Sequence, residues 1–269
     1  MLKKILWIVI LLLLVPPAWY LANLPDTREL QTANPKTTAI RTFREEQLRK
    51  KGGKPHSLME WRRLDQISPY LLHAVVLAED DTFFQHQGFD IEALKRAAQM
   101  NWERKRFAFG ASTITQQLAR TLYLSSNKNL LRKAKEALIT RRLEKTLSKK
   151  RILELYMNVV EWGPQVYGAE AAAEFFFNKP ALELTLDEAI SLAAILPSPR
   201  RWNPLKQSRF MARRKAALTD RMIMANYIPP AVSSETVAVS SEPAASPPFD
   251  SQPLTTDEAE PLLEDRPSD

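Results

Sequence analysis

The chain has 269 residues, contains no cysteine and only three histidines, and carries a formal net charge of +7. The lack of cysteine excludes a disulfide framework and a thiolate metal site, and the absence of a His-x-x-x-His pair argues against a catalytic zinc ion. Residues 229–269 hold nine acidic residues and one arginine, a net of −8, which leaves +15 on residues 1–228 and suits that part to phosphate-bearing substrates or anionic lipid head groups.

An almost unbroken apolar run over residues 5–24 follows a short basic stub at residues 1–4. Twenty helical residues span roughly 30 Å, the thickness of bilayer hydrocarbon, so we predict a transmembrane anchor here. A cleaved signal peptide is the alternative, but Pro16-Pro17 interrupts the run and no clean Ala-x-Ala cleavage site follows. Lysines before the span predict a cytoplasmic N-terminus, with the rest of the chain on the outer side of the inner (cytoplasmic) membrane. That location argues against nucleic acid as a partner.

Residues 25–67 are interpreted as a juxtamembrane lead-in, and residues 68–228 are predicted to fold as one all-α domain. Helices are expected at residues 70–80, 90–104, 112–122, 129–147, from 148 onward and at 185–196, where capping residues precede runs of helix formers. From residue 229 onward Pro, Ser, Ala and acidic residues dominate, so residues 229–269 are predicted to be a disordered tail.

Three successive carboxylates, Glu79-Asp80-Asp81, end the strongly apolar helix expected at residues 70–80. Acids are disfavoured at a helix C-terminus, and burial with mutual repulsion should raise the pKa of at least one of them. A carboxylate with a raised pKa is a better proton acceptor near neutral pH, so this position is typical of a general base. The alternative is a solvated acidic cap, and His86 taken alone would be a structural residue.

A second polar segment, from Gly110 to Arg120, reads Gly-Ala-Ser-Thr-Ile-Thr-Gln-Gln-Leu-Ala-Arg. A glycine before a hydroxyl-rich helix start offers free backbone N–H groups and side-chain donors, which bind phosphates and sugar hydroxyls. An ordinary cap by Ser112 is the alternative.

Basic residues then gather between Arg132 and Arg151. At least half of them would normally be a solvated helix face, and Glu136 lies four residues after Arg132, the spacing of an ordinary helical ion pair.

Five blocks in this region resemble, in order, the glycosyltransferase motifs of the peptidoglycan polymerase family, which includes monofunctional enzymes and the N-terminal half of bifunctional penicillin-binding proteins. They are Glu-Asp-x-x-Phe-x-x-His-x-Gly at Glu79–Gly88, Gly-x-Ser-Thr-Ile-Thr-Gln-Gln at Gly110–Gln117, Arg-Lys-x-x-Glu at Arg132–Glu136, Lys-x-x-Ile-Leu-Glu-x-Tyr-x-Asn at Lys149–Asn158, and a Gly-x-x-x-Ala-Ala block from Gly168. Any one motif would be weak, but five in order over residues 69–204 are specific. Arg120 stands where many members have Lys, and Phe109 stands where a small or polar residue is more usual.

The resemblance implies a lysozyme-like helical glycosyltransferase domain that polymerises lipid II into glycan strands, with inversion at C1 and release of undecaprenyl pyrophosphate. Glu79 would be the base, and Glu136 would hold the pyrophosphate environment, with Mg²⁺ or Mn²⁺ as a divalent cation there; no organic cofactor is implied. The implied substrate-binding residues are Ser112, Thr113, Gln116, Gln117, Arg120, Lys128, Arg132 and Lys149, and the supporting ones are Asp80, Phe83, His86, Gly88 and Asn158. The expected partners are lipid II, the growing glycan chain, membrane lipids, and cell-wall or division proteins.

Two other functions compete with this interpretation. A glycan hydrolase would use a pair of carboxyl groups and has no need of a basic phosphate track. A catalytically silent membrane scaffold is the other alternative, and intact Glu79, Glu136 and Lys149 argue against it. The match of residues 125–128 to Ser-x-x-Lys lacks a Lys-Thr-Gly partner and a second domain, so we interpret the chain as monofunctional, without transpeptidase activity.

Overall fold

The computed structural model describes residue 4 and residues 15–105, 110–124, 129–206 and 208–228. Residues 15–22 are helical. The first half of the anchor predicted over residues 5–24, residues 5–14, lies outside the described part of the chain, as does the tail at residues 229–269. Within the described residues, no helix combines the length and the apolar character needed to cross a bilayer.

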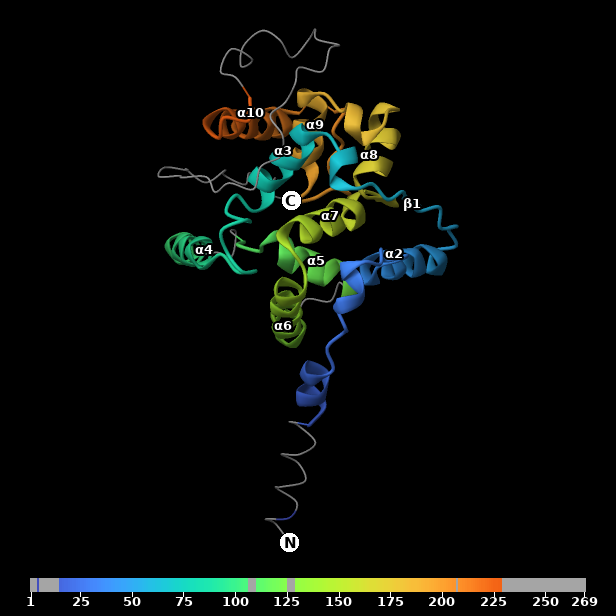
Figure 1. Ribbon diagram of the computed structural model, residues 1–269, viewed down its shortest axis with the longest axis vertical. Helices are drawn as coiled ribbons and strands as arrows, with labels where there is room; N and C mark the ends of the chain where they lie inside the picture. Colours follow the sequence, from blue (N-terminus) through green and yellow to red (C-terminus); the bar gives the residue numbers. More distant parts are fainter. Residues whose placement is uncertain (1–3, 5–14, 106–109, 125–128, 207, 229–269) are drawn as a thin grey trace.

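The described part of the chain is mainly helical, as predicted (Figure 1). Its longer helices are α2 (Ala39–Lys50), α3 (Pro69–Glu79), α4 (Ile91–Glu103), α5 (Ile114–Tyr123), α6 (Leu130–Thr146), α7 (Lys149–Val159), α8 (Ala169–Phe177), α9 (Leu186–Ile195) and α10 (Arg209–Met224). Single 3₁₀ turns form η1 (Arg28–Gln31), η2 (Leu64–Gln66) and η3 (Ala181–Glu183).

The buried helix α3 packs against α9 and α10, and α5 packs against α2, α6 and α7. Leu71, Leu118 and Ile152, one from each of α3, α5 and α7, are fully buried in the same apolar core. Helix α4 lies at the edge of the molecule, as Figure 1 shows. The C-terminal end of α3 and the N-terminal end of α5 are therefore both held by a rigid core.

A small sheet, which the helical pattern did not predict, accompanies the helices. Strands β1 (Leu58–Met59), β2 (Glu161–Gly163) and β3 (Val166–Tyr167) are arranged in the order β1-β3-β2, with β1 parallel and β2 antiparallel to β3. Each strand has only two or three residues, too few for a recognisable alternation of apolar and polar positions.

The helix starts follow the predicted capping chemistry at several positions. Asp90, Asn129, Ser148 and Thr185 each accept a backbone N–H of the helix that they begin. The expected start at Ser112 is wrong by one residue, because Thr113 caps α5 and forms a capping box with Gln116.

The lead-in at residues 25–67 packs along the domain. Arg142 donates to the carbonyls of Leu24 and Pro25, and Arg151 donates to those of Leu30 and Ala33. Backbone carbonyls that lie against a protein surface, away from water, need such donors. The lead-in is therefore attached to α6 and α7 by side chains of the domain.

Candidate active site

Glu79 is the last residue of α3 and faces the side chain of Gln117 on α5. The Gln117 Nε2 donates to Glu79 Oε2 over 2.7 Å. The other carboxylate oxygen, Oε1, is buried and has no hydrogen-bond partner among the described residues. Burial raises the pKa of Glu79, while the bond from Gln117 and the charges of Arg214 and Arg120 act in the opposite direction. This combination of a raised pKa and an unoccupied oxygen suits a general base.

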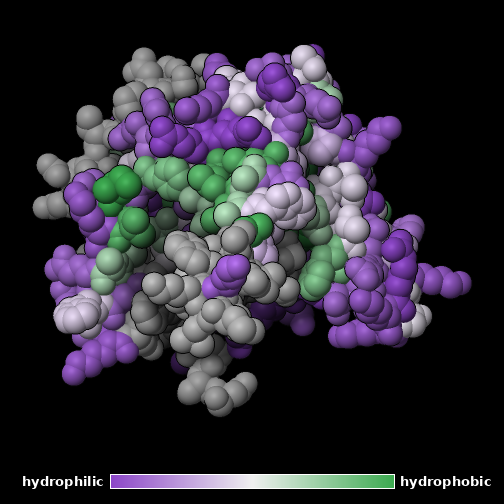
Figure 2. All heavy atoms as spheres, turned by 90° about the horizontal axis from the view of Figure 1, so that it is seen from below, coloured by the Kyte–Doolittle hydropathy of each residue, from purple (hydrophilic) through white to green (hydrophobic). Residues whose placement is uncertain are grey.

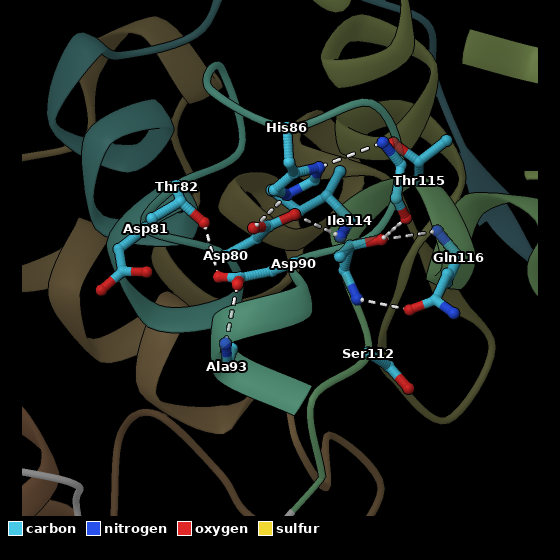
Figure 3. Close-up of polar contacts among 12 residues, drawn as sticks. Asp80, Asp81, Thr82, His86, Asp90, Ala93, Ser112, Ile114, Thr115 and Gln116 are labelled. Carbon is cyan, nitrogen blue, oxygen red and sulfur yellow. Dashed lines mark hydrogen bonds and ion pairs between the residues drawn. The ribbon is translucent and has the colours of Figure 1, made fainter. Parts of the chain in front are cut away.

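The neighbouring Asp80 makes different contacts, which Figure 3 shows. Its Oδ2 accepts the backbone N–H of Ile114 over 2.9 Å, and its Oδ1 lies 2.8 Å from His86 Nε2. The Gly88 N–H donates to His86 Nδ1, so Nε2 carries the proton that His86 donates to Asp80. Asp80 therefore joins the end of α3 to the start of α5 and fixes the position of Glu79 relative to Gln117.

The third carboxylate, Asp81, accepts from Arg221 of α10 over 2.9 Å and is partly exposed. Asp81 therefore fits the alternative of a solvated acidic cap, whereas the Asp80 side chain is buried.

At the start of α5, part of the polar run serves the backbone. The Thr113 hydroxyl donates to the carbonyl of Gly88, and Gln116 Oε1 accepts the N–H of Thr113. Both side chains are buried. Ser112, in contrast, is partly exposed, and its hydroxyl lies 3.4 Å from Lys133 Nζ. The substrate-binding roles assigned to these residues stay predictions.

Glu136 on α6 is buried between two cations. Arg132 donates to its Oε2 over 2.6 Å, and Lys133 is paired with Oε1. No group of three or more acidic or histidine side chains that could hold a metal ion occurs in the described residues. One carboxylate with both oxygens bound to cations does not fit a metal site made by the protein, and we derive no step through a metal.

Lys149, the first residue of α7, pairs with Glu144 over 2.8 Å and lies 4.5 Å above the ring of the buried Phe83. Gly88 has a φ of +90°, and a Cβ there would lie 2.8 Å from Thr140 Cγ2, so glycine is required for α6 to pack closely. The structure thus brings the first, second and fourth motifs together around α6.

One predicted residue, Asn158, stands apart from this group, and Lys128 lies outside the described residues. Asn158 is fully buried at the far end of α7, where it accepts the N–H of Arg62 and donates to its carbonyl, both over 2.7 Å. The hydrogen bonds of its side chain go to Arg62 in the lead-in and to the Glu154 carbonyl on α7.

Comparison with known proteins decides the family. Residues 45–223 match the family model described as Transglycosylase. The chain belongs to this family. Proteins named biosynthetic peptidoglycan transglycosylase include one from Nitrosospira multiformis, 42% identical over 72% of this chain and 84% of the relative. One from Azoarcus sp. is 43% identical over 78% of this chain and 88% of the relative. One from Aromatoleum aromaticum is 47% identical over 63% of this chain and 74% of the relative.

Some residues that contact Glu79, Asp81 or Glu136, or act on them through their charge, were not predicted from the sequence as site residues. The positive charge of Arg214 on α10 lowers the pKa of Glu79. Arg221 pairs with Asp81, and Lys133 pairs with Glu136. Tyr156 is the tyrosine of the fourth motif, for which the sequence predicted no role, and its hydroxyl donates to Gln117 Oε1. No spacing signal links α10 to α3, because their contact arises only from tertiary packing.

Proposed function

We propose that Glu79 removes the proton from the 4-hydroxyl of the acceptor sugar during polymerisation of lipid II. As a transglycosylase of this family, the chain is a peptidoglycan glycosyltransferase that acts in cell-wall synthesis. The observation that supports the base is the buried Oε1 of Glu79, which has no partner among the described residues. As the proton moves to Glu79, the acceptor oxygen bonds to C1 of the donor, and the bond from C1 to the pyrophosphate oxygen breaks, with inversion at C1.

The leaving pyrophosphate needs positive charge more than it needs a proton. Arg132 and Lys133 neutralise Glu136, and the exposed part of Lys133 reaches Ser112 at the start of α5. We assign the pyrophosphate to this end of α6, with Arg120, Lys128 and Lys149 as further cations.

The predicted anchor and membrane location form the second part of the proposal. Figure 2 shows hydrophobic side chains gathered on the face of the molecule that looks toward the N-terminus. Trp19, within the predicted anchor, and Leu130 on α6 are 67% and 88% exposed. Lys135 of α6 lies 4.0 Å above the ring of Tyr20. Aromatic and basic residues beside exposed apolar ones are typical of a surface that lies at a bilayer interface, where both lipid-bound substrates reside.

Polymerisation of purified lipid II by the detergent-solubilised protein tests the proposal. The parent and Asp81→Asn should make long glycan strands, and Glu79→Gln should make none. Asp81→Asn is the matched control, because it also neutralises a carboxylate of the same run but one that pairs with Arg221. Strands from Glu79→Gln would refute the base, and cleavage of finished glycan instead of synthesis would assign the chain to the hydrolases.

A further inference from the structure

Glu79 and Gln117 are the first two members of a longer hydrogen-bonded chain. The hydroxyl of Tyr156, on α7, donates to Gln117 Oε1 over 3.1 Å, and Gln117 Nε2 donates to Glu79 Oε2 over 2.7 Å. Tyr156 is 1% exposed. Three helices, α3, α5 and α7, each contribute one residue to this chain.

The order of donors and acceptors gives the chain a direction. An amide side chain can rotate by half a turn and exchange its oxygen with its nitrogen. In the exchanged orientation the Gln117 oxygen would face the Glu79 carboxylate, and the two acceptors would repel each other. The Glu79 carboxylate and the Ser112 carbonyl already favour the orientation in which the NH₂ group faces Glu79, and the Tyr156 donor at the opposite end of the amide adds to that preference.

We propose that Tyr156 is a positioning residue for the reaction, which orients the Gln117 amide so that Glu79 Oε2 is held and Oε1 alone receives the proton of the acceptor hydroxyl. This inference rests on the proposed role of Glu79 as the base. Tyr156 touches neither substrate nor reacting atoms in this scheme, and it acts through Gln117.

The electrostatic surroundings are consistent with a permanent donor. Burial and the negative charge of Glu79 raise the pKa of Tyr156 well above its ordinary value, so the phenol keeps its proton throughout the working pH range. The other charged groups that act on Glu79 are Asp80 at the end of α3, Arg120 on α5 and Arg214 on α10.

The Gln117 bond lowers the pKa of Glu79 against the effect of burial. When the Tyr156 hydroxyl is removed, the amide keeps only its Nε2 contacts to Glu79 and, at 3.5 Å, to the Ser112 carbonyl. It is then held less firmly, and this lowering is weakened. The pKa of Glu79 should then rise further, and a base that must be ionised would become active only at higher pH.

The test is the pH dependence of lipid II polymerisation by Tyr156→Phe, which keeps the ring and removes the hydroxyl. The acidic limb of kcat/KM should move to higher pH, and the rate near neutral pH should fall roughly three- to tenfold, the worth of one hydrogen bond. Tyr167→Phe is the matched control: Tyr167 is also 1% exposed, and its hydroxyl has no hydrogen-bond partner among the described residues. That variant should keep the parent's pH profile.

A double substitution separates positioning from packing. In a Gln117→Ala background, Tyr156→Phe should cause no further shift of the acidic limb, because its route to Glu79 is gone. An unchanged limb in the single Tyr156→Phe variant, or a full shift that persists without Gln117, would overturn the inference. Failure of the underlying assignment looks different: either the parent makes no polymer, or Glu79→Gln remains active.

Discussion

At the scale of single residues, the fold buries the Glu79 side chain, where its charged form is unfavourable. The folded protein holds Glu79 with a raised pKa, so it binds that proton more tightly than the unfolded chain does. The charged form, which a base requires, therefore destabilises the fold above this pKa, and that penalty disappears as the pH falls through it. Activity and stability should respond to acid in opposite directions at this residue.

Glu79→Gln should accordingly stabilise the protein while abolishing polymerisation. The neutral amide keeps an oxygen for Gln117 and removes the buried charge, so we expect a gain of roughly 0.5–2 kcal/mol in the free energy of unfolding. Thermal or denaturant unfolding near neutral pH measures it. A loss of stability in this variant would show that the carboxylate is favourably bound in the folded state.

The pH dependence of the parent enzyme follows from the same residue. If Glu79 is the base, as proposed, it must be ionised to accept a proton, so kcat/KM should fall as the pH decreases through a pKa above the usual value of a glutamate. Steady-state polymerisation measured across the acidic range checks this. An acidic limb of kcat/KM at the ordinary glutamate pKa would show that a residue other than Glu79 is the base.

The sequence could predict which residue types lie at the site more readily than which partner each of them contacts. Three adjacent acids after an apolar helix predicted a raised pKa, and burial is its largest cause at Glu79. Yet Asp80 and Asp81 have the same side chain and opposite surroundings, because one meets Ile114 N–H and the other Arg221. Those partners come from distant elements, and local spacing holds no information about them.

At the scale of elements, capping chemistry predicted helix starts, while the segment around β3 and α8 needed tertiary contacts. Gly168, before α8, has φ +85° and ψ 156°, a conformation that is nearly confined to glycine. A Cβ at this position would lie 2.6 Å from the backbone oxygen of Asn158. The glycine lets α8 approach the end of α7.

Gly168→Ala should therefore destabilise the fold by roughly 2–5 kcal/mol, the sum of backbone strain and a backbone clash. Gly52→Ala shares a positive φ but meets nothing within 4 Å, so it should cost only the conformational part, about 1–2 kcal/mol. Gly110→Ala has neither problem and should be close to neutral. Equal effects of the three substitutions on chemical denaturation would contradict this ranking.

At the scale of the whole molecule, the lead-in and the domain behave as one body. Arg151 on α7 donates to the carbonyls of Leu30 and Ala33 and to the Asn34 side chain. The sequence indicated only a juxtamembrane lead-in at residues 25–67 and gave no sign of how it contacts the domain. The attachment depends on carbonyl groups, which are present at every position and leave no mark in a sequence.

Arg151→Ala should release this segment. Three hydrogen bonds to the lead-in disappear at once, so limited proteolysis should cut between η1 and α2 about ten times faster than in the parent. Lys150→Ala, at an exposed position one residue earlier, should leave the rate unchanged. The lead-in also contacts Thr146: the Thr27 hydroxyl lies 2.9 Å from its hydroxyl, and Gln31 donates to its carbonyl. Equal rates for the two variants would mean that these contacts hold the lead-in without Arg151.

The buried Oε1 of Glu79 also has a consequence for inhibitor design. In the free protein this oxygen is already out of water and has no partner among the described residues. A small molecule that offers it a hydroxyl or an ammonium group would gain a charge-assisted hydrogen bond without stripping water from the carboxylate. Such a compound should bind more weakly in acid, as Glu79 becomes protonated, so the pH dependence of its affinity would reveal whether it has reached Oε1 of Glu79.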